Sequence, residues 1–326
     1  MADIAATFLR DQLVDRRHKL TAALDWQPEE THLRRLLNDV DAALAKMGQG
    51  TYGICELCHE PVEASRLISD PLVRYCLDHL TAAERSALEY DLQAAAGLQR
   101  GLLPPVETEY EGWQITHRYR PLGAVSGDYC DLVSDDGRGL FFFLGDVSGK
   151  GVAASMLTAQ LHAIFGSLVA RRLGVAPVIN EASHIFGRSA LSPFFATLVG
   201  GRVAAGTQLE IANAGHCPPL LVRGGTVTRL EASGVPLGIS SNGGCHSELL
   251  QLDAGDLLLI YTDGLTEARN TEDEEYGEER VIESVRRHSH ASACDVVDAA
   301  VEGMERFLGT QAPSDDLTVM AIRRSG

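Results

Sequence analysis

The sequence predicts an α+β fold in two parts: a helical N-terminal segment, then a longer segment in which short strands alternate with helices. Three observations carry this prediction. Apolar residues recur at helical spacing as far as Met47, and short apolar runs bounded by turn residues follow Pro105. The 326 residues suffice for two domains of roughly 100–200 residues each. With 45% hydrophobic residues, the chain can bury a proper core.

The formal net charge of −17 argues against broad affinity for nucleic acids and anionic membranes, because both attract clustered Lys and Arg side chains. No run approaches the roughly 18 apolar residues of a membrane span, and the charged N-terminus does not resemble a signal sequence. Seven cysteines, unevenly spread, do not form the pattern of a disulfide framework. We therefore expect a cytoplasmic protein that binds neither nucleic acid nor membrane.

The N-terminal residues predict two amphipathic helices joined by a short turn. In the first, the apolar residues at helical spacing are Leu9, Leu13, Leu20 and Leu24. In the second, an i, i+3, i+4, i+7 rhythm is set by Leu33, Leu36, Leu37, Val40, Leu44 and Met47. Together they predict a helical hairpin.

Four side chains after the hairpin have the spacing of a structural zinc site. Cys55 and Cys58 form a Cys-x-x-Cys pair, and Cys76 with His79 forms a Cys-x-x-His pair further along. Two such pairs present four ligands to a tetrahedral ion. The alternative, three buried thiols and a surface histidine, requires unrelated residues to fall into two close pairs. The sequence therefore predicts one structural Zn²⁺.

The hairpin and these pairs resemble the DksA/TraR zinc-finger family, through Gly50-Thr-Tyr-Gly-Ile-Cys-Glu-Leu-Cys58, Arg66-Leu67 and Cys76-Leu-Asp-His79. His79 stands where a fourth cysteine is common. The resemblance indicates a first domain at residues 1–80. Members of that family can enter the secondary channel of RNA polymerase. It therefore implies one candidate function, an RNA-polymerase-associated regulator that uses the remainder of the chain as a scaffold.

A third helix is expected from Ala82 to Gly101, within a linker at residues 81–104 that ends at a Pro-Pro pair. Its residues near a heptad line are Leu88, Leu92, Ala95 and Leu102. Such a seam can be buried against the domain or against a second copy of the helix, and the pattern alone does not choose between the two.

The remaining residues, 105–326, predict hairpin-linked strands with intervening helices. We expect a helix over 152–170. The expected strands are 139–144, 195–203, 208–211, 256–261 and 318–322.

Four aspartates stand beside turn residues where a strand or turn ends: Asp128, Asp146, Asp263 and Asp315. Taken singly, an aspartate in such a place is most often a turn former or a helix N-cap. Taken together, carboxylates that converge from distant positions can hold Mg²⁺ or Mn²⁺, which prefer oxygen ligands. Such a site suits hydrolysis of a phosphate ester.

The motifs of this segment resemble the SpoIIE/RsbU branch of the metal-dependent PPM serine/threonine phosphatases. In order, they are Ser-Gly-Asp-Tyr-Cys-Asp131, Gly-Asp-Val-Ser-Gly-Lys-Gly151, Phe-Phe-Ala-Thr-Leu198, Asn-Ala-Gly-His-Cys-Pro-Pro219, Tyr-Thr-Asp-Gly-Leu-Thr-Glu-Ala268 and Asp-Asp-Leu-Thr-Val319. The resemblance spans about residue 105 to 326. It implies an α-β-β-α sandwich, in which two β-sheets lie between outer helices and the metals lie at one edge.

The resemblance assigns roles residue by residue. Asp146 would bridge two Mn²⁺ or Mg²⁺ ions, with the carbonyl of Val147 completing one coordination shell. Asp263 and Asp315 match the other metal-binding aspartates. The remaining acids are Asp128, which matches the acid of the Gly-Asp motif, and Asp316, which would hold a coordinated water.

Two residues beside these motifs keep two interpretations each. Lys150 could meet the substrate phosphate as a point charge or could be solvated, and we favour the substrate role. His216 could act as a general acid or could be a structural histidine of a turn-rich loop.

The resemblance implies a phosphatase that hydrolyses phosphoserine or phosphothreonine by two-metal activation of water. It further implies a role in signal transduction and sigma-factor regulation, with a STAS-domain anti-sigma-factor antagonist as substrate. The helix over 82–101 resembles the linker that couples an upstream module to the catalytic domain in this branch. We therefore expect a homodimer that forms through this helix.

Overall fold

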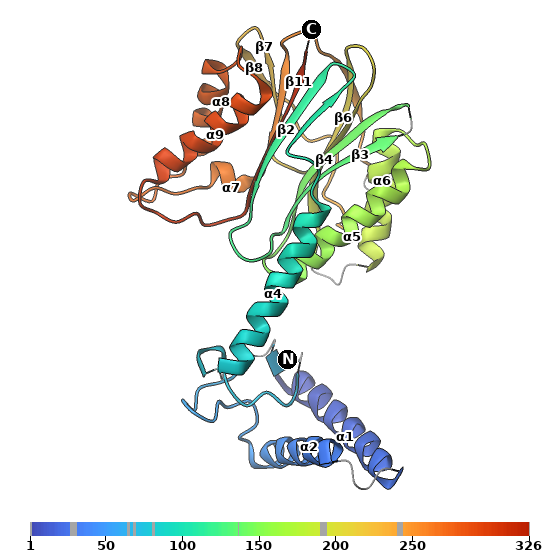
Figure 1. The fold of residues 1–326 in the computed structure, drawn as a ribbon, viewed down its shortest axis with the longest axis vertical. Helices are drawn as coiled ribbons and strands as arrows, with labels where there is room; N and C mark the ends of the chain where they lie inside the picture. The colour runs from blue at the N-terminus through green and yellow to red at the C-terminus, as the bar shows by residue number, and fades with distance from the viewer. Residues whose placement is uncertain are drawn as a thin grey trace. The chain divides into compact units, whose positions relative to one another are not determined.

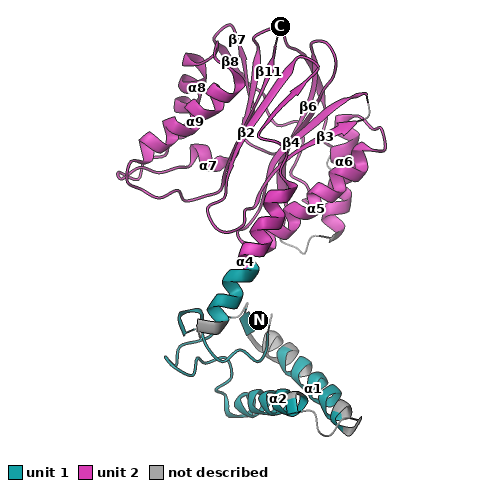
Figure 2. Cartoon of the chain, in the orientation of Figure 1, with its two compact units in different colours: residues 1–91 teal, residues 92–326 magenta. Residues whose placement is uncertain are grey.

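The computed structural model describes residues 2–26, 31–63, 66–67, 70–79, 82–135, 137–189, 194–239 and 244–325. It divides into two compact units, residues 1–91 (unit 1) and 92–326 (unit 2), which Figure 2 shows in two colours. Helix α4 (Ala82–Leu102) runs through this boundary, so its first half belongs to unit 1 and its second half to unit 2. The division at 80/81 and 104/105 stays a prediction.

Unit 1 contains the predicted helical hairpin. Its helices are α1 (Ala2–Trp26) and α2 (Thr31–Gln49), and the turn between them lies outside the described residues. Leu13 and Val40 are fully buried where the two helices pack together. The helical periodicity of the sequence is therefore confirmed. After α2 come loops and a short 3₁₀ helix, η1 (Leu77–His79).

Unit 2 contains two antiparallel sheets. One sheet has the order β1-β2-β11-β10-β7-β8, and the other has the order β3-β4-β5-β6-β9. The strands of the first are β1 (Glu107–Tyr110), β2 (Trp113–Arg120), β7 (Leu220–Arg223), β8 (Thr226–Arg229), β10 (Leu257–Tyr261) and β11 (Leu317–Arg324). Those of the second are β3 (Asp128–Asp135), β4 (Gly139–Val147), β5 (Ala196–Val203), β6 (Gln208–Ala214) and β9 (Glu248–Gln251).

Helices cover the outer face of each sheet (Figure 1). The β3–β9 sheet is covered by α5 (Val152–Val169) and α6 (Val175–Ser189). The other sheet is covered by α7 (Asp263–Thr266), α8 (Gly277–Arg287) and α9 (Ala293–Leu308). The α-β-β-α sandwich is thereby confirmed.

Strand alternation explains the layers, because successive side chains of a strand point to opposite faces. On β4, Phe141 and Phe143 belong to the cluster under α5 and α6, whereas Phe142 belongs to the cluster between the sheets. On β10, Leu259 packs toward α8 and α9, whereas Leu258 packs toward the other sheet. These central strands are buried on both faces and therefore read as continuous apolar runs.

Helix α5 is the one helix, among the described residues, that is long and apolar enough by length and composition to cross a membrane. It buries Leu161, Phe165 and Leu168 against the β3–β4 hairpin. Phe165 stacks on Phe143 with ring centroids 4.2 Å apart. Its apolar character is accounted for by this packing.

Six of the described strands were not predicted: β2, β3 and β7, and the three short edge strands β1, β8 and β9, which carry little apolar signal. β1, β8 and β9 are four residues each and mostly exposed or half-buried. Among the predicted strands, β4 continues to Val147 and β6 to Ala214, both beyond the expected ends, whereas β5 and β10 each begin one residue later than expected. Glycine and other small residues occur in those extensions because the neighbouring strands approach closely there and leave no room for a larger side chain. A Cβ atom on Gly145 would lie 2.3 Å from the carbonyl oxygen of Thr197.

Candidate active site

Four predicted aspartates lie together at one end of the two sheets in unit 2. Asp128 is the first residue of β3 and Asp146 is the last but one of β4, and the antiparallel register places them opposite each other. Asp263 begins α7 directly after β10, and Asp315 stands shortly before β11. Asp146 and Asp263 therefore stand where a strand ends, whereas Asp128 begins a strand and Asp315 precedes one. In an antiparallel hairpin, both positions lie at the same end of the sheet.

Two threonines join the sheets at this point by holding Asp128. The hydroxyls of Thr262 and Thr318 donate to Asp128 Oδ2 at 3.1 and 2.6 Å, and all three side chains are buried. The two threonines also bond to each other, because the Thr318 N–H donates to Thr262 Oγ1 at 2.9 Å. Sequence reasoning missed them. The available signal was their position inside the Tyr-Thr-Asp-Gly and Asp-Asp-Leu-Thr motifs.

Burial raises the pKa of Asp128 well above its ordinary range. The Thr318 and Thr262 hydroxyls oppose this shift by stabilising the carboxylate, whereas the nearby Asp146 and Asp316 carboxylates add to it. Asp128 therefore lies behind the acid cluster as a buried, oriented group. Its role as a direct metal ligand stays a prediction.

Gly127 leaves an open cradle beside Asp146. A Cβ atom at this position would lie 3.1 Å from the Val147 carbonyl oxygen and 3.3 Å from Asp146 Oδ1. Gly264 makes a second close approach, since its Cβ would lie 1.9 Å from the carbonyl oxygen of Asp316. A carboxylate oxygen and a carbonyl oxygen beside a glycine form an all-oxygen donor set suited to a hard cation.

The electrostatics of the cluster favour cation binding. Burial, together with the neighbouring carboxylates of Asp263, Asp315 and Asp316, raises the pKa of Asp146 to about 7. Burial also raises the pKa of Asp263, and Asp315 contributes to that shift. Carboxylates that repel one another in a partly buried site are stabilised in common by bound positive charge. The residues present therefore fit the pair of Mn²⁺ or Mg²⁺ ions that the sequence predicts.

Lys150 lies within this cluster. Its ammonium group is 2.9 Å from Asp315 Oδ2 and donates to the carbonyl oxygen of Ser314 at 3.0 Å. This pairing with Asp315 raises the pKa of Lys150, so the side chain remains a cation at neutral pH. The side chain is more than half exposed, so it can also reach an incoming anion. Contact with substrate phosphate stays a prediction.

Asp316 organises the loops around the cluster. Its Oδ1 accepts the Leu122 N–H at 2.6 Å, and its Oδ2 accepts the Gly127 N–H at 2.9 Å. Both carboxylate oxygens are thus engaged by backbone donors. This contact was not foreseen, and the predicted coordinated water at Asp316 stays a prediction.

His216 is a buried loop residue in the structure. Its Nδ1 lies 2.8 Å from Thr197 Oγ1, and its backbone N–H donates to Asn213 Oδ1. Burial lowers the pKa of His216 to about 4, so the imidazole is neutral at pH 7. A neutral, enclosed imidazole favours the structural interpretation over the general acid.

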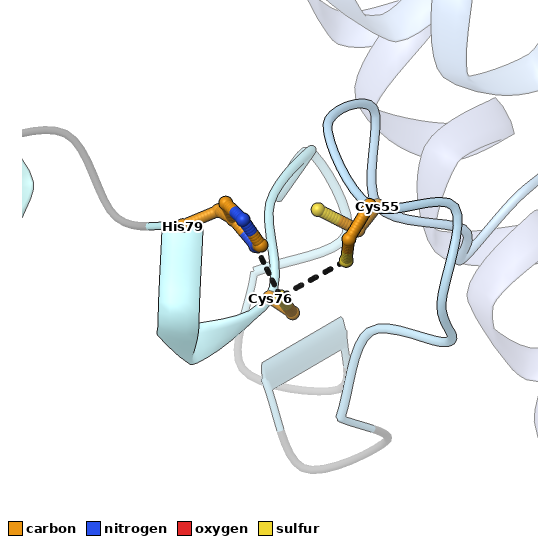
Figure 3. A group of neighbouring side chains, drawn as sticks. Cys55, Cys76 and His79 are labelled. Carbon is orange, nitrogen blue, oxygen red and sulfur yellow. Dashed lines mark hydrogen bonds between the residues drawn. The ribbon is translucent and has the colours of Figure 1, made fainter.

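The second predicted metal site lies in unit 1. One ligand atom from each of Cys55, Cys58, Cys76 and His79 lies within 4.8 Å of the other three. Cys76 Sγ is 3.7 Å from Cys58 Sγ and 3.2 Å from His79 Nδ1, and Figure 3 shows His79 turned toward Cys76. Three sulfur atoms and one imidazole nitrogen at this separation fit a tetrahedral Zn²⁺.

A charged network braces this second site. Glu56, between the two cysteines of the first pair, bonds to Arg74 and to Lys46 of α2. The hydrogen bond from Arg74 is the main reason that the pKa of Glu56 falls to about 2. The network ties the finger loops to the helical hairpin.

Two family models match this chain. Residues 136–325, more than half of the chain, match the model for stage II sporulation protein E (SpoIIE). Residues 50–78 match the model for the prokaryotic dksA/traR C4-type zinc finger. That match covers the three cysteines and ends one residue before His79.

Individual relatives cover most of this chain. It is 26% identical over 266 residues to Protein IcfG of Synechocystis, covering 72% of this chain and 42% of that protein. It is 25% identical over 240 residues to the phosphoserine phosphatase RsbU of Bacillus subtilis, covering 73% of this chain and 71% of RsbU. Among solved structures, the SiaA-PP2C domain of Pseudomonas aeruginosa superposes with a TM-score of 0.65 at 21% identity. That match covers 74% of this chain and 99% of the SiaA domain, and it shows a shared fold.

Proposed function

Because this chain belongs to the SpoIIE family of PPM serine/threonine phosphatases, we propose that it is a metal-dependent phosphatase of phosphoserine or phosphothreonine in proteins. The observation that carries the proposal is the convergence of Asp128, Asp146, Asp263 and Asp315, from four separate motifs, at one end of the sandwich. Isolated turn formers or N-caps would have no reason to gather in this way. Gathered carboxylates cost stability, and such a cost is expected at a functional site.

The residues that would hold a pair of Mn²⁺ or Mg²⁺ ions are Asp146, the Val147 carbonyl, Asp263 and Asp315. When bound, the ions supply an activated water near neutral pH and polarise the phosphoryl oxygens. The chain contributes the placement of these groups. Asp146 is fixed on β4, opposite Asp128. Gly127 has no side chain and therefore leaves room for a phosphate to approach. Lys150 brings a positive charge to the same place.

The substrate that we propose is a phosphorylated STAS-domain anti-sigma-factor antagonist in the cytoplasm. Support comes from the resemblance to the RsbU branch and from the similarity to RsbU, whose name describes a phosphoserine phosphatase. The open, polar surroundings of Lys150 and Asp315 suit a phosphate carried on a protein surface, because a folded substrate cannot enter a deep pocket.

Unit 1 is proposed to hold one structural Zn²⁺ and to position the catalytic unit. The four ligand atoms of Cys55, Cys58, Cys76 and His79 support the zinc. We also propose a homodimer formed through α4. The support is its large exposed side chains, including Tyr90 at 73% and Leu98 at 76% exposure. Sedimentation of the purified protein tests this arrangement, and a fully active monomer would contradict it.

The decisive test of the catalytic proposal is hydrolysis of p-nitrophenyl phosphate, with and without added Mn²⁺. We expect Mn²⁺-dependent turnover in the wild type, and loss of that turnover in Asp146→Asn. The matched control is Asp253→Asn, an exposed turn aspartate of the same unit. Equal turnover in wild type and Asp146→Asn, or none in folded wild type saturated with Mn²⁺, would contradict the proposal.

A second candidate function follows from the dksA/traR-type finger: association with RNA polymerase, with the phosphatase unit as a scaffold. The complete set of predicted metal-binding aspartates argues against a catalytically inactive scaffold. A pull-down with purified polymerase discriminates the two functions. Polymerase binding by the wild type that is lost in Cys76→Ser would favour the scaffold function. No polymerase binding by the wild type would exclude the scaffold function.

A further inference from the structure

Gln99, near the C-terminal end of α4, is a buried polar residue that the proposed reaction does not use. Its side chain is 8% exposed, whereas the preceding Leu98 is 76% exposed. Gln99 Nε2 donates to the carbonyl oxygen of Ser126 at 2.8 Å, and Gln99 Oε1 accepts the Ser126 N–H at 3.0 Å. One side chain therefore satisfies both backbone polar groups of a loop residue that is itself fully buried.

The loop that Gln99 holds leads directly into the acid cluster. Gly127 donates its N–H to Asp316 Oδ2 at 2.9 Å and accepts the Val147 N–H at 3.1 Å. The N–H of Asp128 donates to Ser126 Oγ at 3.0 Å. Every backbone hydrogen-bonding group from the Ser126 N–H to the Asp128 N–H is thus engaged. Of these bonds, the two to Gln99 are the ones that come from outside the aspartate motifs of the sequence.

A third contact joins the Gln99 amide to α5. Nε2 also donates to Thr158 Oγ1 at 3.1 Å, on the buried side of α5. The Thr158 hydroxyl in turn donates to the carbonyl oxygen of Ser155 at 2.8 Å. Gln99 therefore links α4, the loop before β3 and α5, and its N–H and oxygen atoms cannot exchange places without losing bonds. The end of α4 lies beside α5 in Figure 1.

We propose that Gln99 is a positioning residue of the active site: by clamping both backbone groups of Ser126, it sets the place of Gly127 and Asp128 relative to Asp146. The proposal rests on the proposed phosphatase function. The Gln99 side chain bonds to Ser126 and Thr158, so it acts through the loop. Removing the clamp would leave two buried backbone groups unsatisfied, and the loop would move to regain partners for them.

The test is Gln99→Met, which keeps the size of the side chain and removes its hydrogen-bonding atoms. Small displacements of a catalytic group lower rates strongly, so we expect kcat for p-nitrophenyl phosphate to fall about tenfold or more. We expect Mn²⁺ binding, measured by calorimetry, to weaken about tenfold, while KM changes less than about twofold because Gln99 does not reach substrate.

Two matched variants separate positioning from helix anchoring. Gln93→Met changes the same residue type at an exposed position of α4, and Thr158→Val removes the α5 contact while leaving both bonds to Ser126. Both should stay within about twofold of wild type in kcat and in Mn²⁺ affinity. Where Gln99→Met does not fold, Gln99→Glu serves instead. It keeps an acceptor for the Ser126 N–H, loses the donor to the Ser126 carbonyl, and should shift both quantities in the same direction.

Three results decide the question. Reduced kcat and weakened Mn²⁺ binding in Gln99→Met, with both controls near wild type, support the clamp. A Gln99→Met protein that is less stable but binds Mn²⁺ and turns over as wild type does would overturn it, because the residue would then only anchor a helix. A wild type without phosphatase activity would remove the proposed function, and the calorimetric comparison of Mn²⁺ binding would still decide the clamp.

Discussion

Asp146→Asn should stabilise the protein in the absence of Mn²⁺ and Mg²⁺, although it is expected to abolish activity. Burial and, to a lesser degree, three neighbouring carboxylates raise the pKa of Asp146 from 3.8 to about 7. Ionised Asp146 is therefore unfavourable in the folded, metal-free protein and favourable in the unfolded chain. Asparagine has nearly the same shape and never carries the charge.

The size and the pH window follow from the same shift. About three pH units at 1.36 kcal/mol each give roughly 4 kcal/mol, an upper value because water entry and loop relaxation reduce it. With a raised folded-state pKa, the contribution of Asp146 to stability is fully present below the unfolded-state value near 3.8, and it is lost as pH rises through about 7. The advantage of the variant should therefore be absent near pH 4 and reach its plateau above pH 7.

Urea denaturation from pH 4.5 to 8 measures this difference in protein dialysed free of Mn²⁺ and Mg²⁺. Fluorescence of the buried Trp113 follows unfolding of unit 2. Asp253→Asn is the control and should show no such pH-dependent gain. A free energy of unfolding for Asp146→Asn that differs from wild type by the same amount at pH 5 and pH 8 would refute the reasoning.

Three further predictions concern metal binding and the two sites. Mn²⁺ must displace a proton from Asp146, so below pH 7 Mn²⁺ binding should weaken as pH falls and should release about one proton. Calorimetry in two buffers measures this proton release. No proton release at pH 6 would contradict the prediction. Thr318→Val removes the shorter hydroxyl bond to Asp128, which is worth about 1.5–3 kcal/mol. This variant should fold and should have a kcat about tenfold lower than wild type. An unchanged kcat would show that this bond is dispensable. Cys76→Ser should abolish the zinc content measured by mass spectrometry, while Cys294→Ser should leave it unchanged.

The central elements of the fold could be predicted from the sequence because they carry the strongest local signals. β4 and β10 are continuous apolar runs, and α5 is a long apolar helix bounded by Gly151. The edge strands could not be predicted, because a four-residue strand with an exposed face differs little from a loop. Such strands form because a neighbouring strand supplies their hydrogen bonds, and that neighbour lies elsewhere in the sequence.

The acids of the candidate site could be predicted from the sequence as a group, whereas the residues that hydrogen-bond to them and to the adjacent loop could not. Aspartate beside glycine is a visible pattern at Asp128, Asp146 and Asp263, and Asp315 beside Ser314 is a fourth acid next to a turn residue. Thr262, Thr318 and Gln99 are ordinary residue types, and nothing in their local sequence marks them as partners of Asp128 and Ser126. Their roles depend on hydrogen bonds between residues that are 27 to 190 positions apart.

The sequence by itself predicted the helical hairpin, the central strands β4, β5, β6, β10 and β11, the two Cys-containing pairs and the acids of the candidate site, because helical periodicity, apolar runs and ligand spacing are local properties of a chain. Only the tertiary structure decided which ends of which strands meet. The register that places Asp128 opposite Asp146 joins segments with no local mark of their pairing, and the threonine contacts then bring the second sheet to the same place. Burial at that meeting point, which no single segment can create, raises the pKa of Asp146 and suits the site to cations.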